Sequence, residues 1–311
     1  MKHAKESGAA ADFFYKLYLS YIPNKRDNFK QIIVKIFFLL SLAVLIVSAG
    51  YLTNYFLYGK KQESIIEKSR TAWYDAVSTE SDTESAFEIM TESNSDFKGW
   101  ITVPGTKIDN PFFQSSDNEF YLTHNQDKQK STYGALFLDC SNTLTAQKRD
   151  KNLVIYGHHM KNGSMFANLT KYKSLSFYKQ NPIVRFSTIY GESTYKIYAA
   201  FVLNASKADD NGYVYNIYRN KFSDEEDFDS WYSEAAERSI INTDVDVSYG
   251  DNIITLITCD YDFDNARFVV MARETRNGEN ETVDTSKAST NASPRYPKRW
   301  YDERGLEYPY D

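Results

Sequence analysis

One cysteine and one arginine stand close together at the end of an apolar run. Cys259 ends the β-branched stretch Thr255–Cys259, and Arg267 follows eight positions later. A cysteine thiolate can attack a carbonyl carbon, and a guanidinium that stays charged can stabilise the resulting oxyanion. If the two runs are adjacent antiparallel strands, the thiol and the guanidinium lie at the same end of a sheet. The alternatives are a buried thiol without chemistry and a surface ion pair between Arg267 and a nearby aspartate, Asp260, Asp262 or Asp264.

A reactive thiol needs a base or acid beside it, and histidine is the usual one. The chain has four histidines. His158 and His159 directly follow the apolar run "NLVIYG", so they stand at the end of a predicted strand, where a side chain can face a cleft. The alternative for this pair is an ordinary exposed position in a loop.

Metal and nucleic-acid sites find little support in the sequence. Asp260, Asp262 and Asp264 resemble the start of an EF-hand, but the sixth position is Asn265 rather than Gly and the twelfth is Met271 rather than Glu. We therefore predict neither a metal nor a cofactor. A net charge of −6 argues against nucleic acid as a partner.

The second cysteine, Cys140, lies in "FLDCSN", and we interpret it as structural. A disulfide between Cys140 and Cys259 is the other possibility.

The N-terminal part of the chain is organised around one apolar segment. Residues 36–58 run for 23 positions without a charge, which is long enough to span a bilayer. Seven Lys and Arg precede them against three acidic residues, while the following flank to Asp75 has four against three, so the bias places residues 1–35 in the cytoplasm. A cleaved signal peptide ending near Val47–Ala49 is the alternative. Residues 59–97 have the composition of an extracellular helical linker.

From Gly99 onward the pattern is typical of an all-β domain. Eight short β-branched and aromatic runs, separated by turn residues, predict a barrel or sandwich over residues 98–275. Between the sixth and seventh runs, residues 223–242 begin with Ser and acidic residues, as an inserted helix does. Residues 276–311 are polar and without periodicity, so we predict a disordered tail.

These residues together resemble the sortases, extracellular cysteine transpeptidases of Gram-positive bacteria. The motif "TLITC" with its downstream Arg267, preceded by "VIYGHHM", is similar to the family signature, and the helices resemble class B. The resemblance implies a mainly β fold, an eight-stranded sortase-type barrel with N-terminal helices and a helix between strands six and seven. It also implies Cys259 as nucleophile, His158 as acid/base and Arg267 as stabiliser of oxyanion and substrate. Contacts to the peptide substrate would come from four further residues, Tyr156, Thr258, Tyr213 and Val214.

The implied activity is acyl transfer through a thioester. The partners would be secreted proteins with a C-terminal sorting motif, cleaved at a Thr-x bond, and an amine of the peptidoglycan precursor or cross-bridge. The enzyme would sit in the cell membrane as a single-pass protein with its catalytic domain outside. The alternatives are a sortase that polymerises pilins, a wall-directed cysteine peptidase that hydrolyses instead of transferring, and a non-enzymatic surface adhesion module.

Overall fold

The computed structural model describes residues 2–80, 83–208, 210 and 212–310. It divides into two compact units, residues 1–62 and 63–311. The first unit contains α1 (Lys2–Tyr21) and the first part of α2 (Phe29–Glu80). Asn28 and Gln31 cap α2 reciprocally, because each side chain accepts a hydrogen bond from the other residue's backbone N–H, at 2.9 and 2.8 Å. Lys35 closes the turn before α2 through an ion pair with Asp27 at 2.7 Å.

Helix α2 carries the apolar segment of the sequence and continues without a break to Glu80. It is long and apolar enough to cross a bilayer, with an 18-residue window of mean hydropathy 2.8. The helical linker predicted for residues 59–97 is therefore the end of α2 together with α3 (Thr83–Ser93). In the second unit, Trp73 of α2 stacks on Trp100 with ring centroids 5.0 Å apart.

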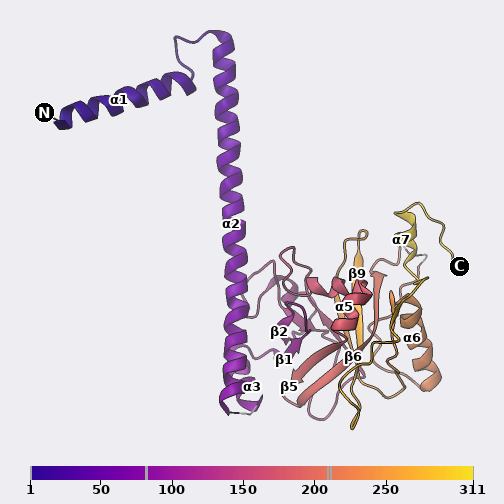
Figure 1. The fold of residues 1–311 in the computed structure, drawn as a ribbon. Helices are drawn as coiled ribbons and strands as arrows, with labels where there is room; N and C mark the ends of the chain where they lie inside the picture. Colours follow the sequence, from indigo (N-terminus) through magenta and orange to yellow (C-terminus); the bar gives the residue numbers. More distant parts are fainter. Residues whose placement is uncertain (1, 81–82, 209, 211, 311) are drawn as a thin grey trace. The chain divides into compact units, whose positions relative to one another are not determined.

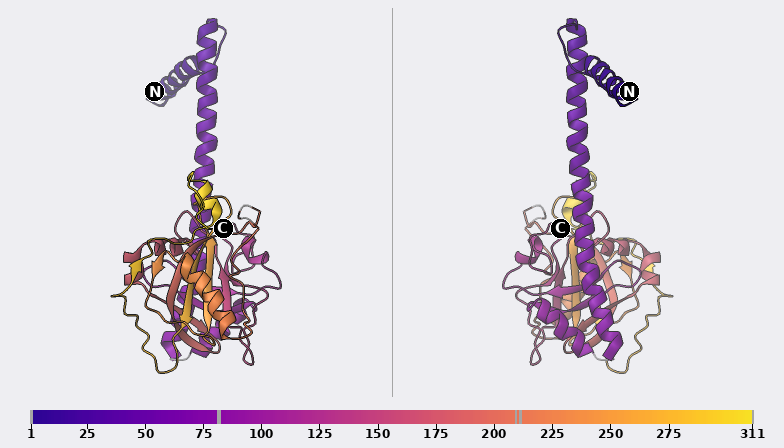
Figure 2. Two further views of the ribbon diagram at one scale, coloured as in Figure 1. Left: turned by 90° about the vertical axis from the view of Figure 1, so that its right-hand side faces the viewer. Right: turned by 90° about the vertical axis from the view of Figure 1, so that its left-hand side faces the viewer.

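The second unit is built on a closed barrel of eight strands, as the sequence predicted (Figure 1; Figure 2). The strand order is β1-β2-β3-β4-β8-β9-β6-β5, and two of its pairs, β2 with β3 and β4 with β8, are parallel. The strands are β1 (Phe97–Thr102), β2 (Asp109–Phe113), β3 (Leu136–Leu138), β4 (Asn152–Tyr156), β5 (Ile183–Thr188), β6 (Gly191–Asn204), β8 (Ile253–Cys259) and β9 (Ala266–Glu274). All eight coincide with the eight predicted runs.

Side chains along β8 and β9 point alternately to the barrel interior and to the outer face, so each strand contributes to two hydrophobic clusters. Leu256 and Phe268 belong to the cluster that fills the barrel interior. Ile257 and Val269, one residue along, belong to a second cluster on the outer face. That outer cluster is covered by α6 (Glu225–Arg238) and by the later part of the β6–α6 loop, residues 212–224.

Short helices join the strands. The inserted helix α6 lies within the predicted segment, residues 223–242, but it ends at Arg238, because Ile241–Asn242 pair with the tail as β7. Asp224 caps its start by accepting a hydrogen bond from the backbone N–H of Asp227 at 2.9 Å. The other short helices are α4 (Phe120–Thr123), the 3₁₀ helix η1 (Ala167–Lys173) and α5 (Leu175–Gln180).

The prediction of a disordered tail differs from the structure. Strand β10 (Ser289–Thr290) pairs with β7 (Ile241–Asn242), and α7 (Lys298–Asp302) follows. The tail is held by distant partners: the Lys287 ammonium pairs with Asp244 at 2.8 Å, and Asn291 N–H donates to the Ile240 carbonyl at 2.9 Å. Such contacts leave no periodic pattern in the sequence, which is why composition alone indicated disorder.

Candidate active site

The barrel brings His158, Cys259 and Arg267 into one row. Strand β8 pairs with β9 so that Cys259 lies opposite Arg267. Strand β4 pairs with β8 in parallel, with Tyr156 beside Ile257, and Gly157 N–H continues the ladder by donating to the Ile257 carbonyl at 3.1 Å. Extended two residues past the end of β4, the same register sets His158 level with Cys259. The three residues that the sequence singled out therefore stand on adjacent strand ends.

Cys259 and Arg267, which are directly paired, project from the same face of the sheet. Side chains of neighbouring paired residues share a face, and so do residues two apart along a strand. Beneath the row, the register aligns Tyr156, Ile257, Val269 and Phe201 on the outer face. Leu203, which pairs with Arg267, continues the row of His158, Cys259 and Arg267. An apolar floor thus lies under three polar groups, each of which is partly exposed.

Cys259 ends its strand, and its backbone is held by the second histidine. His159 Nδ1 lies 2.8 Å from the Cys259 carbonyl oxygen, so this ring nitrogen donates to it. The Tyr261 hydroxyl donates to the His159 carbonyl at 3.0 Å, and the two rings lie 4.7 Å apart. These contacts fix the end of β8 and leave the thiol accessible. His159 therefore supports the backbone of Cys259.

His158 is positioned by the segment between α4 and β3. Its Nε2 lies 2.7 Å from the Leu122 carbonyl oxygen. Gly134 stands at the same edge of the ring, where a Cβ atom would lie 3.0 Å from His158 Cδ2 and 2.4 Å from the Tyr121 carbonyl oxygen. Only glycine fits here without a shift, and its φ of +59° also favours glycine. Sequence reasoning identified the histidine but not the turn that holds it.

Arg267 keeps most of its hydrogen-bonding capacity for a ligand. One guanidinium nitrogen, Nη1, donates to the Ala266 carbonyl at 3.0 Å. Two of the three aspartates that could have paired with it are instead bound to Lys173, with Asp260 at 2.7 Å and Asp262 at 3.1 Å. Across the described part of the chain no carboxylate forms an ion pair with Arg267. A charged fork beside a thiol is suited to binding an oxyanion.

Tyr156, two residues before His158, binds a buried carboxylate. Its hydroxyl donates to Asp139 Oδ2 at 2.6 Å, and Asp139 is only 6% exposed. Burial and this hydrogen bond hold the pKa of Tyr156 well above its usual range. Burial would raise the pKa of Asp139, but hydrogen bonds from Ser141, Tyr156 and Asn118 together lower it. The Tyr156 hydroxyl is therefore a fixed, neutral donor.

Tyr218 also belongs to this site, and sequence reasoning missed it. Its ring lies 6.4 Å from that of Tyr156, and it is about half exposed. Burial raises its pKa, while the positive charge of Arg267 acts against this rise. The run "YVYNIY" in the β6–α6 loop, which ends at Tyr218, indicated that aromatic side chains gather beside this site.

The other predicted peptide contacts are not all in the row. Thr258 is 2% exposed and faces the barrel interior, because its strand partner is the core residue Phe268. Its side chain therefore points away from Cys259. Val214 packs against the outer core, and Tyr213 is exposed and donates to Glu234 Oε2 at 2.5 Å. Both lie in the β6–α6 loop that covers the outer face.

Neither cysteine is bridged in the structure. Cys140 is exposed and Cys259 is partly exposed, and both are free thiols. The disulfide considered from the sequence is thus not formed, and the position of Cys140 at the surface does not suit a core packing role.

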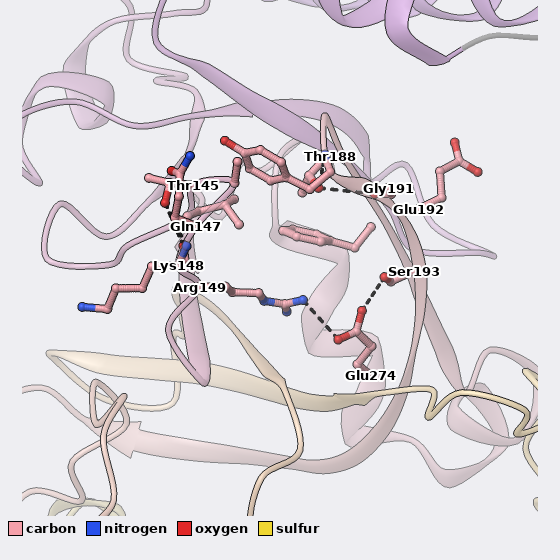
Figure 3. A pocket seen from close by; sticks show the side chains of 13 residues that line it. Thr145, Gln147, Lys148, Arg149, Thr188, Gly191, Glu192, Ser193 and Glu274 are labelled. Carbon is pink, nitrogen blue, oxygen red and sulfur yellow. Dashed lines mark hydrogen bonds and ion pairs between the residues drawn. The ribbon is translucent and has the colours of Figure 1, made fainter.

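A pocket of about 340 Å³ lies at the opposite end of the barrel (Figure 3). Arg149 and Glu274 form an ion pair across it at 3.1 Å. Glu274 ends β9, whereas Arg267 stands near its start, so this pocket is separate from the row.

A comparison with family models supports the geometry. The Sortase domain model matches residues 101–275, which include the whole barrel row. Sortase B of Listeria monocytogenes is 34% identical over 231 residues, covering 72% of this chain and 90% of the relative. This chain belongs to the class B sortases. It is therefore a cysteine transpeptidase of the cell wall.

Solved class B sortases have the same fold. The Staphylococcus aureus sortase B–substrate complex is 28% identical with a TM-score of 0.63, covering 71% of this chain and 99% of that structure. A sortase B complexed with triglycine also has 28% identity and a TM-score of 0.63, covering 70% of this chain and 99% of that structure. The sortase model ends at residue 275, before the tail begins.

Proposed function

We propose that this sortase cleaves a C-terminal sorting signal of secreted proteins at a Thr-x bond and transfers the protein to a cell-wall amine through a Cys259 thioester. The observation that carries the proposal is the row of His158, Cys259 and Arg267 on adjacent strand ends. It supplies a nucleophile, a proton carrier and an oxyanion partner above an apolar floor, which is the set that acyl transfer requires.

In the first half-reaction, Cys259 Sγ attacks the carbonyl carbon of the threonine residue. The carbon–sulfur bond forms, and the negative charge that develops on the carbonyl oxygen is bound by the Arg267 fork. The carbon–nitrogen bond then breaks as the leaving amine takes a proton from His158. The products are a thioester on Cys259 and the released C-terminal peptide.

In the second half-reaction, an amine attacks the thioester. His158 accepts the proton from the amine, the carbon–sulfur bond breaks, and the thiolate returns. The sortase B complexed with triglycine supports a small, unbranched amine as the acceptor here. A lysine of a pilin and water remain the alternative acceptors, and they correspond to the polymerase and the peptidase considered above.

In the same proposal, α2 anchors the enzyme in the cell membrane with residues 1–35 in the cytoplasm. The hydropathy of its apolar window and the excess of Lys and Arg before it support this orientation. The anchor would keep the catalytic barrel outside, at the site where secreted proteins emerge.

The test uses the full chain in detergent micelles with a peptide library varied around Asn/Ser/Pro-Pro-x-Thr-x. We expect a mass adduct on Cys259 and release of the C-terminal fragment, both abolished by Cys259→Ala. Cys140→Ala is the matched control, because that thiol is exposed but lies outside the row. Cleavage by the Cys259→Ala enzyme would overturn the assignment.

A second arm separates transfer from hydrolysis. Triglycine is added at increasing concentration, and the ratio of ligated to hydrolysed product is measured by mass spectrometry. A transpeptidase gives ligated product in proportion to the amine, whereas a peptidase gives only the free acid at every concentration.

A further inference from the structure

The connection between β8 and β9 is acidic and joins the two groups of the proposed chemistry, Cys259 and Arg267. Asp260 directly follows the cysteine, and Asp262 and Asp264 lie further along. A carboxylate beside a thiol disfavours the thiolate, and it also opposes the oxyanion that forms on the substrate. A counter-charge at this connection would therefore favour the reactive form of the site.

Lys173, the last residue of η1, supplies such a counter-charge. Its Nζ lies 2.7 Å from Asp260 Oδ2 and 3.1 Å from Asp262 Oδ1. The Asp260 carboxylate is buried, so solvent screens this ion pair only weakly. Asp264, in contrast, is exposed, and water screens its charge. The ammonium thus binds the carboxylate that would otherwise act most strongly on the neighbouring thiol.

The packing of η1 against the barrel positions this ammonium. Tyr172 belongs to the interior core, and its hydroxyl donates to the Asn181 carbonyl at 2.7 Å. Lys173 Nζ lies 5.7 Å from the centre of the Phe268 ring, within the range of a cation–π contact. Phe268 is a core residue that directly follows Arg267 on β9, so the ammonium is held against the strand that carries the arginine.

We propose that Lys173 is a positioning residue of the reaction, which offsets the negative charge of the β8–β9 connection so that the thiolate forms and the Arg267 fork stays available to the oxyanion. Lys173 acts through the two carboxylates that it binds. The proposal rests on the proposed function, because it takes Cys259 as the nucleophile and Arg267 as the oxyanion partner.

The size of the effect follows from the charge left uncompensated. Without the ammonium, the carboxylates of Asp260 and Asp262 would stand at the connection with no partner among the described residues. An unpaired negative charge next to a thiol lowers the thiolate fraction about tenfold. The transition state of acylation carries the same negative charge, so turnover should fall by a similar factor.

The test measures how fast iodoacetamide alkylates Cys259 at pH 7 and low salt, in the full chain carrying Cys140→Ala so that one thiol is left. This reagent is uncharged, so its rate reports the thiolate and not attraction of the reagent. Lys173→Met keeps a long apolar side chain but removes the charge. We expect it to slow alkylation about tenfold and to lower kcat/KM for a cleaved sorting peptide by a similar factor.

Lys171→Met is the matched control. Lys171 is exposed on the same helix, and its ammonium lies 5.4 Å from the centre of the Phe177 ring. Both rates should change less than about twofold in this variant. Unchanged alkylation in Lys173→Met would exclude the role of Lys173 as a counter-charge.

A triple variant, Lys173→Met/Asp260→Asn/Asp262→Asn, separates charge from structure. It lacks the two ion pairs, as Lys173→Met does, but it also lacks the two carboxylates. If the charge balance governs the thiol, alkylation and kcat/KM return at least to the values of the parent chain. If Lys173 only holds the connection in place, both rates stay low, and that result would overturn the proposal.

Two further outcomes keep the test decisive. If Lys173→Met does not fold, the triple variant still tests the proposal, because it leaves no buried charge unpaired at this connection. Rates of the triple variant below those of the parent would then contradict it. If the parent is alkylated but cleaves no peptide, the proposed function fails, while the alkylation rates still decide the role of Lys173.

Discussion

Arg267 differs from the other arginines at the ends of β9 in what it contacts. Arg273 and Arg276 are bound by carboxylates, with distances of 3.0 Å from Arg273 to Glu279 and 2.7 Å from Arg276 to Asp251. Arg267 bonds only to its neighbour's carbonyl within the described part of the chain, because Lys173 holds two of the adjacent aspartates. A structural arginine is usually satisfied by the protein, so an unsatisfied fork at this position suits a ligand.

At the residue scale, Arg267→Lys tests this interpretation. Lysine keeps the charge but loses the planar fork, so a bidentate contact to the oxyanion and peptide is no longer possible. We expect kcat/KM for sorting peptide cleavage to fall about a hundredfold, while the free energy of unfolding changes by less than about 0.5 kcal/mol. Arg185→Lys, an exposed change on β5, is the control for arginine replacement in general. Unchanged turnover in Arg267→Lys would exclude the arginine from transition-state binding.

At the element scale, the loop between α4 and β3 decides where His158 points. Gly134→Ala would place a Cβ atom against the Tyr121 carbonyl and the His158 ring, at a backbone φ of +59°. We expect a stability loss of about 1–2 kcal/mol from the backbone strain, and a fall in kcat that exceeds this loss because the imidazole is displaced. Thermal unfolding and steady-state kinetics measured on the same preparation separate the two effects.

The control for this change is Gly250→Ala. Gly250 also has a positive φ, at +95°, but nothing lies within 4 Å of the Cβ that would be added. Gly250→Ala should lose stability through backbone strain, and its kcat should not fall. Equal kinetic effects in both variants would mean that Gly134 acts on stability alone.

The sequence predicts the strands better than it predicts the contacts between strands that are distant in the chain. The strands were predictable because their β-branched runs and intervening turns are local signals, and the motif "TLITC" indicated Cys259 as the candidate nucleophile. The row itself could be inferred only in part: pairing of β8 with β9 follows from a short connection, but the parallel pairing of β4 with β8 joins residues about a hundred positions apart. Gly134 and Tyr218 enter the site by such long-range contacts, and Thr258 leaves it because strand alternation turns its side chain inward.

At the scale of the whole molecule, the tail depends on charges at the far end of the barrel. Arg273 is 1% exposed, and its guanidinium is bound by Glu279 of the tail and by Asp246. The hydrogen bond from Arg273 is the main cause that lowers the pKa of Glu279 far below its usual range, and Lys196 adds to it. The unfolded chain takes up this proton near pH ~4.3, whereas the folded chain resists it to lower pH.

Glu279 therefore stabilises the folded chain at pH values above about 4, and its contribution is lost as the pH falls below that value. Glu279→Gln should lower the free energy of unfolding at pH 7 by about 1–3 kcal/mol, because it leaves a buried guanidinium with fewer acceptors. The difference from the parent chain should shrink in acid, because the unfolded parent takes up the proton there and so becomes more stable relative to the folded parent. Glu281→Gln is the matched control, since Glu281 accepts from the Thr194 hydroxyl, at 2.9 Å, and not from a buried guanidinium. Urea unfolding at pH 7 and pH 3 measures both changes, and a Glu279→Gln deficit of equal size at the two pH values would show that this ion pair does not hold the tail.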